Sequence, residues 1–229
     1  RSVRLHSLPQ THIEDITVVT DYEGTTGRVD YTVETAGSAD VSVVLRDETG
    51  KVVATGTGAS GFLEIADVTL WQPGAAYLYE LVVTLADGDT TVDEYVQTVG
   101  VRTVEVRGTE FLINGEPFYF KGFGKHEDTA IRGKGHDNAF LVHDFQLLEW
   151  IGANSFRTSH YPYAEDVLEF ADRHGMVIID ETAAVGLNML IEAGLTQNKL
   201  KYTFGPDVLG DASQAAMMQH VRELIARDK

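Results

Sequence analysis

The sequence contains no cysteine among its 229 residues. Disulfide bonds, thiol nucleophiles and cysteine-based metal sites are therefore excluded. The chain also lacks any run approaching the ~20 consecutive apolar residues that a membrane-spanning helix needs. Hydrophobic residues make up 43% of the sequence, which is typical of a soluble globular protein. The chain begins at Arg1, without Met or a signal-like apolar stretch, which predicts that the natural amino terminus is missing.

Positive charge is scarce in this sequence. Lys and Arg number 18 against 35 Asp and Glu, which gives a formal net charge of −17 at pH 7. A strongly acidic surface repels phosphate backbones, so no nucleic-acid partner is expected. The acidic residues are spread along the chain, and this favours a well-solvated surface over an acidic interaction tail.

Residues 1–103 are predicted to form an immunoglobulin-like β-sandwich. Stretches that are β-branched or alternate apolar with polar residues predict strands, and they occur at 16–20, 29–33, 41–43, 77–83 and 91–96. Turn residues separate these stretches, and about seven short strands in about a hundred residues are typical of such a sandwich. The region holds no cluster of candidate catalytic residues, and Trp71 is interpreted as a packing residue rather than a sugar-stacking one.

Residues 104–229 alternate strand-like and helix-like patterns of apolar residues, which predicts the start of a TIM barrel. A linking hairpin is expected around the Asn114-Gly115 turn. Beyond it, strands and amphipathic helices alternate. Strands are expected at 118–122, around Arg157 before Pro162, and at 176–181, and helices at 141–151 and 164–171. The run 176–181 is continuously apolar before its terminal acids, which predicts a parallel strand buried on both faces.

The end of the chain predicts an incomplete barrel. Residues 182–210 form a long irregular segment, which favours a functional loop or partial disorder. A last helix is expected from Asp211 or Ser213, with an apolar face of Met217, Met218, Val221, Leu224 and Ile225. No strand follows it before Lys229, and so few βα units cannot close an eight-stranded barrel.

Polar residues gather where the three predicted parallel strands end. The three ends carry, in order, 125–128, then Arg157 with 159–161, and finally Asp180 with Glu181. Because parallel strands bring their carboxyl ends to one rim, these side chains are expected to form a site. Such donors and acceptors suit a polyhydroxylated ligand, and Glu127 with Glu181 is a conceivable carboxylate pair for glycoside hydrolysis. A divalent metal on His126, His160 and a carboxylate is the weaker alternative, because no metal-binding histidine spacing is present.

Several motifs carry a family resemblance. They are Gly122-Phe-Gly-Lys-His-Glu-Asp128, Ile131-Arg-Gly-Lys-Gly135, Trp150 to Glu165 with its Arg-Thr-Ser-His-Tyr-Pro-Tyr core, and Val177 to Gly186. In the sandwich, 52–56, 70–74 and 77–81 fit the same family. Together they resemble the bacterial β-glucuronidases of glycoside hydrolase family 2 over essentially the whole chain.

The resemblance implies a fold, an activity and a set of site residues. The expected parent is a retaining hydrolase of β-D-glucuronides that needs no cofactor or metal, works as a homo-oligomer and resides in the bacterial cytoplasm. His126 and His160 match histidines that line the sugar subsite. Arg157 matches an arginine near the nucleophile, where a fixed cation keeps a carboxylate ionised. Asp180 and Glu181 match supporting acids, whereas Arg132 and Lys134 lie in a family-typical loop without direct substrate contact.

The chain departs from the family pattern in lacking its chemistry. The general acid of the Asn-Glu pair, the nucleophilic Glu and the Asn-x-Lys motif that reads the uronate carboxylate are all absent, so no catalytic residue is expected here and the fragment should be inert. Glu127 and Glu181 are accordingly not the catalytic pair. Segment 187–210 replaces a longer loop that borders the aglycone. Two alternatives stay open: a β-galactosidase-like family 2 fragment, which Ile131–Gly135 disfavours, and a non-catalytic carbohydrate-binding or assembly module.

Overall fold

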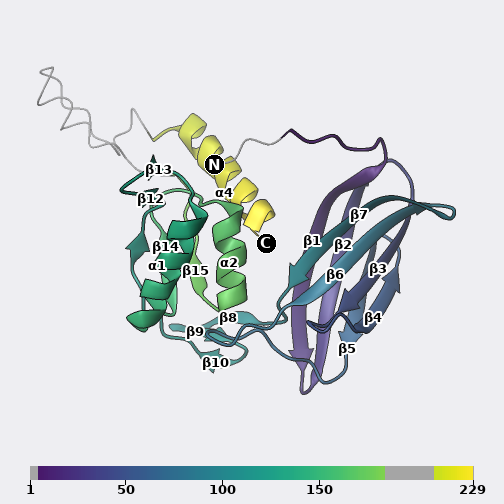
Figure 1. The fold of residues 1–229 in the computed structure, drawn as a ribbon, viewed down its shortest axis with the longest axis horizontal. Helices are drawn as coiled ribbons and strands as arrows, with labels where there is room; N and C mark the ends of the chain where they lie inside the picture. The colour runs from purple at the N-terminus through teal and green to yellow at the C-terminus, as the bar shows by residue number, and fades with distance from the viewer. Residues whose placement is uncertain (1–4, 184–208, 229) are drawn as a thin grey trace, which may run out of the picture. The chain divides into compact units, whose positions relative to one another are not determined.

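A computed structural model describes residues 5–183 and 209–228 (Figure 1). The chain divides into two compact units. The first comprises residues up to 121 together with 169–177, and the second comprises 122–168 and the residues from 178 onward. The expected immunoglobulin-like sandwich and the incomplete TIM barrel are both confirmed, and each is described separately below. No helix within the described ranges is long and apolar enough to cross a membrane.

The sandwich consists of two antiparallel sheets, labelled in Figure 1. One has the strand order β1-β2-β5 and the other β4-β3-β6-β7. The strands are β1 (His12–Glu23), β2 (Thr26–Ala36), β3 (Asp40–Arg46), β4 (Val52–Thr57), β5 (Ser60–Ile65), β6 (Tyr79–Asp87) and β7 (Thr90–Val99). The seven strands match the number expected from the alternating pattern.

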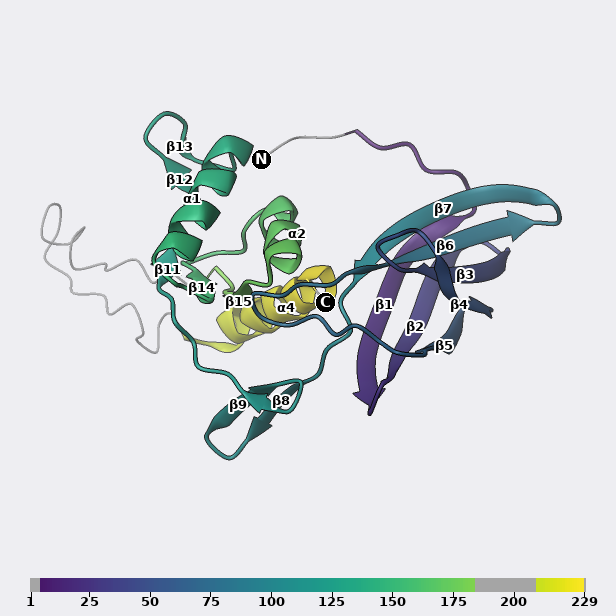
Figure 2. The ribbon, with the colours of Figure 1, turned by 60° about the horizontal axis from the view of Figure 1, so that its bottom comes forward.

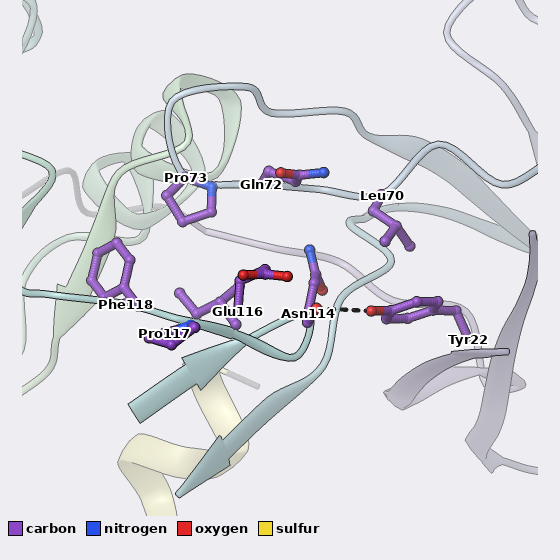
Figure 3. A pocket seen from close by; sticks show the side chains of 9 residues that line it. Tyr22, Leu70, Gln72, Pro73, Asn114, Glu116, Pro117 and Phe118 are labelled. Carbon is purple, nitrogen blue, oxygen red and sulfur yellow. Dashed lines mark hydrogen bonds between the residues drawn. The ribbon is translucent and has the colours of Figure 1, made fainter. Parts of the chain in front are cut away.

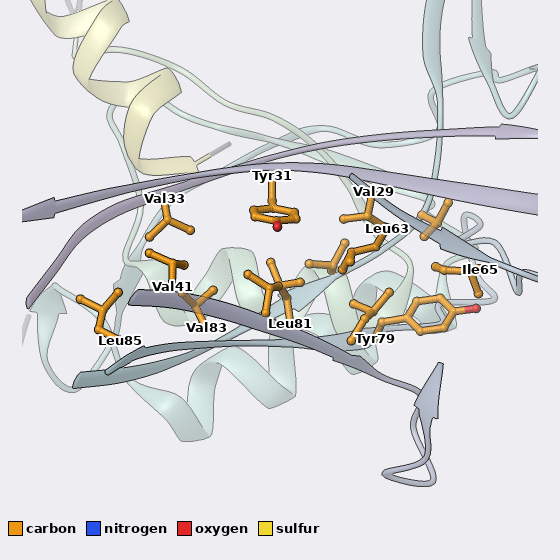
Figure 4. Packing of buried hydrophobic residues seen from close by; sticks show 14 residues of the cluster. Val29, Tyr31, Val33, Val41, Leu63, Ile65, Tyr79, Leu81, Val83 and Leu85 are labelled. Carbon is orange, nitrogen blue, oxygen red and sulfur yellow. The ribbon is translucent and has the colours of Figure 1, made fainter. Parts of the chain in front are cut away.

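The core of the sandwich lies between the inner faces of these sheets (Figure 4). Alternate residues of β2 and β6 point inward, including Val29, Tyr31, Leu81 and Val83, all of them buried. Burying one such side chain contributes about 1.5–3 kcal/mol of hydrophobic free energy. The period-2 pattern in the sequence therefore produces this core directly, because it places every second side chain on one face.

A small hairpin sheet follows the sandwich, in the order β10-β9-β8; its strands β8 and β9 are labelled in Figure 2. Its strands are β8 (Val104–Arg107), β9 (Glu110–Ile113) and β10 (Glu116–Pro117), and Asn114 at its turn has a positive φ of 52°. The prediction of a strand at 118–122 is wrong. Phe118 and Phe120 pack against each other and against Phe111, with ring centroids 4.9–6.4 Å apart, so this stretch joins an aromatic cluster instead of a sheet.

The opening of the barrel lies largely in the second unit, although residues 169–177 of it belong to the first. Its parallel sheet has the order β11-β14-β15, formed by β11 (Gly124–Lys125), β14 (Ser155–Thr158) and β15 (Val177–Ile179). Helices α1 (Asn138–Trp150) and α2 (Glu165–His174) alternate with these strands, and a hairpin of β12 (Asp128–Thr129) and β13 (Gly133–Lys134) precedes α1. The three strands leave the barrel open within the described part of the chain.

Two burial predictions for the barrel segment are wrong. Strand β15 lies at the edge of its sheet, and Ile179 is 45% exposed, because no described strand pairs with its outer side. Helix α4 (Asp211–Asp228) begins at the expected residue but buries none of its side chains, and Met218 and Ile225 of the predicted apolar face are exposed. The predicted loop at 182–210 lies almost entirely outside the described residues.

Trp71 is a packing residue within the first unit, as the sequence predicted. Its side chain is 3% exposed, and its indole Nε1 donates to the carbonyl oxygen of Asp172 at 2.7 Å. Gly74 N likewise donates to Gly175 O at 2.9 Å. Asp172 O also accepts from Gly175 N at 3.4 Å, so the indole adds a shorter second bond to a carbonyl in the last turn of α2, where backbone acceptors lack full helical pairing. Loop 71–75 therefore caps the C-terminal end of this helix.

Trp71→Phe is expected to lower the free energy of unfolding by about 1 kcal/mol, because it removes the indole donor and leaves Asp172 O with the longer bond from Gly175 N. Denaturant unfolding followed by circular dichroism measures this change. The matched control is Trp150→Phe, since Trp150 is 82% exposed and should change stability by less than about 0.5 kcal/mol. Equal effects of the two substitutions would show that the Trp71 cap is not stabilising.

Candidate functional site

The site is built on strands β11 and β14, which run parallel with Gly124 opposite Arg157 and Lys125 opposite Thr158. Glycine is required at the entry to β11. A Cβ atom on Gly124 would lie 2.3 Å from Ser159 Oγ and 3.1 Å from a guanidinium nitrogen of Arg157. The close approach of the two strands places the residues that follow them side by side.

His126 and His160 face each other directly after these strands. Their rings meet edge to face, with centroids 5.4 Å apart. His160 follows a cis peptide bond from Ser159. The structure therefore brings together the two histidines that the sequence places 34 positions apart.

Glu181 links the second and third strand ends. Its carboxylate lies 3.1 Å from Nη1 of Arg157 and 3.4 Å from Nδ1 of His160. Arg157 and His160 are partly exposed, at 43% and 40%, so solvent can reach both. A carboxylate shared by a cation and an imidazole fixes the orientation of both side chains. This arrangement suits the recognition of an oxygen-rich ligand, because Arg and His present N–H donors outward.

Asp180, which is partly buried, makes a separate set of contacts. Its Oδ1 accepts hydrogen bonds from Thr158 Oγ1 at 2.8 Å and from Glu181 N at 2.9 Å. Burial and the neighbouring carboxyl of Asp228 raise the pKa of Asp180 from 3.8 to about 6. Two carboxyl groups in contact favour one shared proton. Asp180 is thus a buttress between β14, β15 and the end of α4.

The raised pKa of Asp180 predicts an unusual pH dependence of stability. A carboxyl group that binds its proton more tightly when folded stabilises the fold at low pH, and this contribution is lost as the pH rises through about 6. Asp180→Asn replaces the protonated carboxyl with an amide, which also donates a hydrogen bond but does not titrate. This variant should therefore be more stable than the native chain at pH 7 by about 1 kcal/mol, a value reduced to allow for the partial exposure of Asp180.

This advantage of Asp180→Asn should vanish below about pH 4, where the native carboxyl is protonated in both states. Urea unfolding at pH 4, 5, 6 and 7 measures the difference between the two chains. Asp87→Asn, at the exposed end of β6, serves as the control and should show no such trend. A pH-independent difference between Asp180→Asn and the native chain would contradict the shared-proton arrangement.

Lys125 was predicted at the strand end, but the residues that support it were not. Lys125 forms an ion pair with Asp144 of α1 at 2.6 Å, and Tyr163 donates a hydrogen bond to the carbonyl oxygen of Lys125. Burial raises the pKa of Tyr163, so this hydroxyl stays a donor. Only the fold brings these residues, together with Asp228, to the strand ends, because no local pattern marks them. Lys134, which the sequence placed outside the site, lies 3.9 Å above the ring of Tyr161.

Two further features of the described residues bear on where a ligand could bind. Among residues 5–183 and 209–228, no group of three or more His, Asp or Glu side chains is arranged to hold a metal ion. A pocket of about 400 Å³ lies in the first unit (Figure 3). None of the predicted site residues lines it, and its walls are Tyr22, Leu70, Gln72, Pro73, Ile113, Asn114, Glu116, Pro117 and Phe118.

The chain matches two family models. The model described as "Glycosyl hydrolases family 2" matches residues 11–102, and the model described as "Glycosyl hydrolases family 2, TIM barrel domain" matches residues 104–229. Together the two matches span both the sandwich and the barrel segment, including every residue of the site described above.

Relatives of known activity are similar over the whole chain. A β-glucuronidase of Paenibacillus borealis is 51% identical over 100% of this chain and 38% of its own length, and that of Mus musculus is 45% identical over 100% and 34%. The chain thus spans about a third of the length of these relatives.

Solved structures agree with these sequence matches. The β-glucuronidase of Ruminococcus gnavus in complex with D-glucuronic acid superposes with a TM-score of 0.84 at 39% identity, covering 97% of this chain and 35% of that one. The β-D-glucuronidase of Dictyoglomus thermophilum gives a TM-score of 0.86 at 45% identity, covering 96% of this chain and 36% of that one. The expected family is confirmed by both kinds of comparison, and the chain belongs to glycosyl hydrolase family 2.

Proposed function

We propose that this chain is the part of a retaining β-glucuronidase that carries the first sugar-lining residues of its active site. The observation that supports it most is the group of four side chains at the ends of the parallel strands, His126, His160, Arg157 and Glu181. These are hydrogen-bonding and charged groups on a rigid sheet edge, and the similar Ruminococcus gnavus structure contains D-glucuronic acid.

The proposal assigns each residue a role. His126 and His160 donate hydrogen bonds to sugar hydroxyls. Arg157 supplies a fixed positive charge beside the reaction centre, where it keeps a carboxylate ionised. Glu181 orients Arg157 and His160, and Asp180 holds the strand ends in place.

The two domains of the proposal meet at residues 103 and 104. The sandwich occupies 1–103 and the amino-terminal part of the catalytic barrel occupies 104–229. The family matches at 11–102 and 104–229 support this division.

The chain of 229 residues is expected to be inactive by itself. Retaining hydrolysis needs one carboxyl group as acid and a second as nucleophile. The carboxylates nearest the histidines are both engaged, since Glu127 accepts from Ala164 N and Glu181 binds Arg157. Purified chain should release no more nitrophenol from 4-nitrophenyl β-D-glucuronide than a mock preparation from the same host. Turnover that co-purifies with the chain would contradict this expectation.

Sequencing the encoding DNA beyond Lys229 tests whether a longer parent protein carries the catalytic motifs of a β-glucuronidase. For a glucuronidase we expect an Asn-Glu pair within about twenty codons, an estimate from loop and strand lengths, and an Asn-x-Lys motif further on. An Asn-Glu pair without Asn-x-Lys would favour the β-galactosidase-like alternative. The absence of both motifs would favour a non-catalytic carbohydrate-binding or assembly module.

The proposal also includes assembly and location. The outer edge of β15 and the exposed apolar residues of α4 favour association of the chain with itself, so a homo-oligomer is expected. Sedimentation velocity at several concentrations tests this, and a monomer at every concentration would contradict it. We further propose a bacterial cytoplasmic location, without a nucleic-acid or membrane partner, which fractionation of the source cells would test.

A further inference from the structure

Glu127 directly follows His126 but is turned away from solvent. Its exposed fraction is 7%, and its Oε1 accepts a hydrogen bond from Ala164 N at 3.0 Å. Ala164 immediately precedes α2, where the backbone N–H groups have no partners within the helix and the macrodipole favours a negative charge. A buried carboxylate is costly unless it is paired in this way. Glu127 therefore fastens the segment after β11 to the start of α2.

His136 and the backbone of Gly135 make further contacts with Glu127. His136 is 12% exposed and lies between two carboxylates, with Nδ1 3.9 Å from Glu127 and Nε2 3.5 Å from Asp166 of α2. The carbonyl oxygen of Glu127 accepts from Gly135 N at 2.9 Å. Residues 127–136 are thus closed into a loop whose two ends meet at Glu127.

Two tyrosines that follow β14 bind backbone groups on both sides of His126. Glu127 N donates to the hydroxyl of Tyr161 at 3.1 Å. One residue before His126, the carbonyl of Lys125 accepts from Tyr163, whose hydroxyl also lies 3.2 Å from Ser159 O. His126 and His160 are held within this lattice of bonds, with their ring centroids 5.4 Å apart.

We propose that Glu127 is a positioning residue, which fixes His126 against His160 by anchoring the segment after β11 to the amino end of α2. The inference rests on the proposed function, in which the two histidines bind the sugar. It assigns Glu127 neither acid, base nor ligand contact, because its side chain is only 8% exposed. The hydrogen bond to Ala164, rather than the negative charge, is the important interaction.

Nuclear magnetic resonance of the whole chain tests this assignment. The first readout is the nuclear Overhauser contact between the rings of His126 and His160. The second is the shift of their imidazole signals on titration with D-glucuronate. Glu127→Gln keeps an oxygen that can accept from Ala164 N, so both readouts should match the native chain. Glu127→Ala should lose the ring contact and weaken D-glucuronate binding by up to roughly tenfold, the effect of removing one hydrogen bond. Glu149→Ala, on the exposed side of α1, is the matched control.

The outcomes separate the alternatives. A ring contact that persists in folded Glu127→Ala would overturn the proposal. Weaker D-glucuronate binding by Glu127→Gln with the ring contact intact would also overturn it, because the charge of Glu127 would then act on the ligand. If Glu127→Ala does not fold, Glu127→Met decides, because it fills similar space but cannot accept from Ala164 N; an unchanged ring contact there overturns the proposal. If D-glucuronate shifts neither histidine in the native chain but the contact depends on Glu127, the positioning role stands and the proposed function fails.

Discussion

Gly122→Ala should prevent the second unit from folding stably. A Cβ atom at this position would lie 1.8 Å from the carbonyl oxygen of Ser155 and 2.6 Å from its carbonyl carbon. These are backbone atoms at the start of β14, so no rotamer change relieves the overlap, and the strands themselves must separate. The expected loss is about 3 kcal/mol or more, at the upper end of what overpacking costs. Thermal unfolding by near-ultraviolet circular dichroism measures it.

The control for this substitution is Gly210→Ala in the same unit. Gly210 has open space around its Cβ position and no positive φ, so the change should stay within about 0.5 kcal/mol. The sandwich core lies in the first unit and should keep its resolved resonances in Gly122→Ala. A Gly122→Ala protein as stable as Gly210→Ala would contradict the close strand approach on which the site is built.

Glu181→Ala should have the largest effect on the site itself. The substitution removes the partner of both Arg157 and His160, which lie 3.1 and 3.4 Å from the carboxylate. Both side chains then gain rotational freedom, and their donors are no longer aimed at one ligand. We expect D-glucuronate binding to weaken at least about tenfold, because hydrogen bonds between charged groups contribute roughly 1.5–3 kcal/mol.

Calorimetric titration with D-glucuronate measures the effect of Glu181→Ala. Glu181→Gln provides the comparison, because its amide oxygen can still accept from Arg157 while the charge is removed. An intermediate loss is expected for Glu181→Gln, and a loss within twofold for Glu149→Ala on α1. Native affinity in Glu181→Ala would show that the Arg157 and His160 orientations do not depend on Glu181.

The sequence is sufficient to predict the sandwich and the order of barrel elements. Alternation such as Val29 to Val33 specifies strands, because only a period of two places every second residue in a core. Gly152 and Gly175 mark the ends of α1 and α2, since both adopt the positive φ values of 73° and 67° that favour glycine. The convergence of His126, Arg157, His160 and Glu181 follows from the parallel arrangement of their strands.

The remaining features depend on contacts between distant residues. Phe118 and Phe120 have strand-forming composition, but their packing against Phe111 takes this stretch out of the sheet. Glu127 is chemically indistinguishable in the sequence from a catalytic acid. Its 7% exposure and its 3.0 Å bond with Ala164 N, 37 positions away, show that its side chain is turned inward. The pairing of Asp180 with Asp228 is equally invisible to local patterns.

A titration of the chain with D-glucuronate, followed at the imidazole resonances of His126 and His160, tests the central claim most directly. If these histidines line a sugar subsite, both signals should shift together along one saturable curve, with weak affinity in about the millimolar range, where binding free energy is roughly −4 kcal/mol. The histidines outside the site, such as His143 on α1, should not move, and an equal concentration of mannitol should leave all signals unchanged. Shifts confined to residues of the sandwich, or no shift at His126 and His160 up to saturating D-glucuronate, would contradict the account.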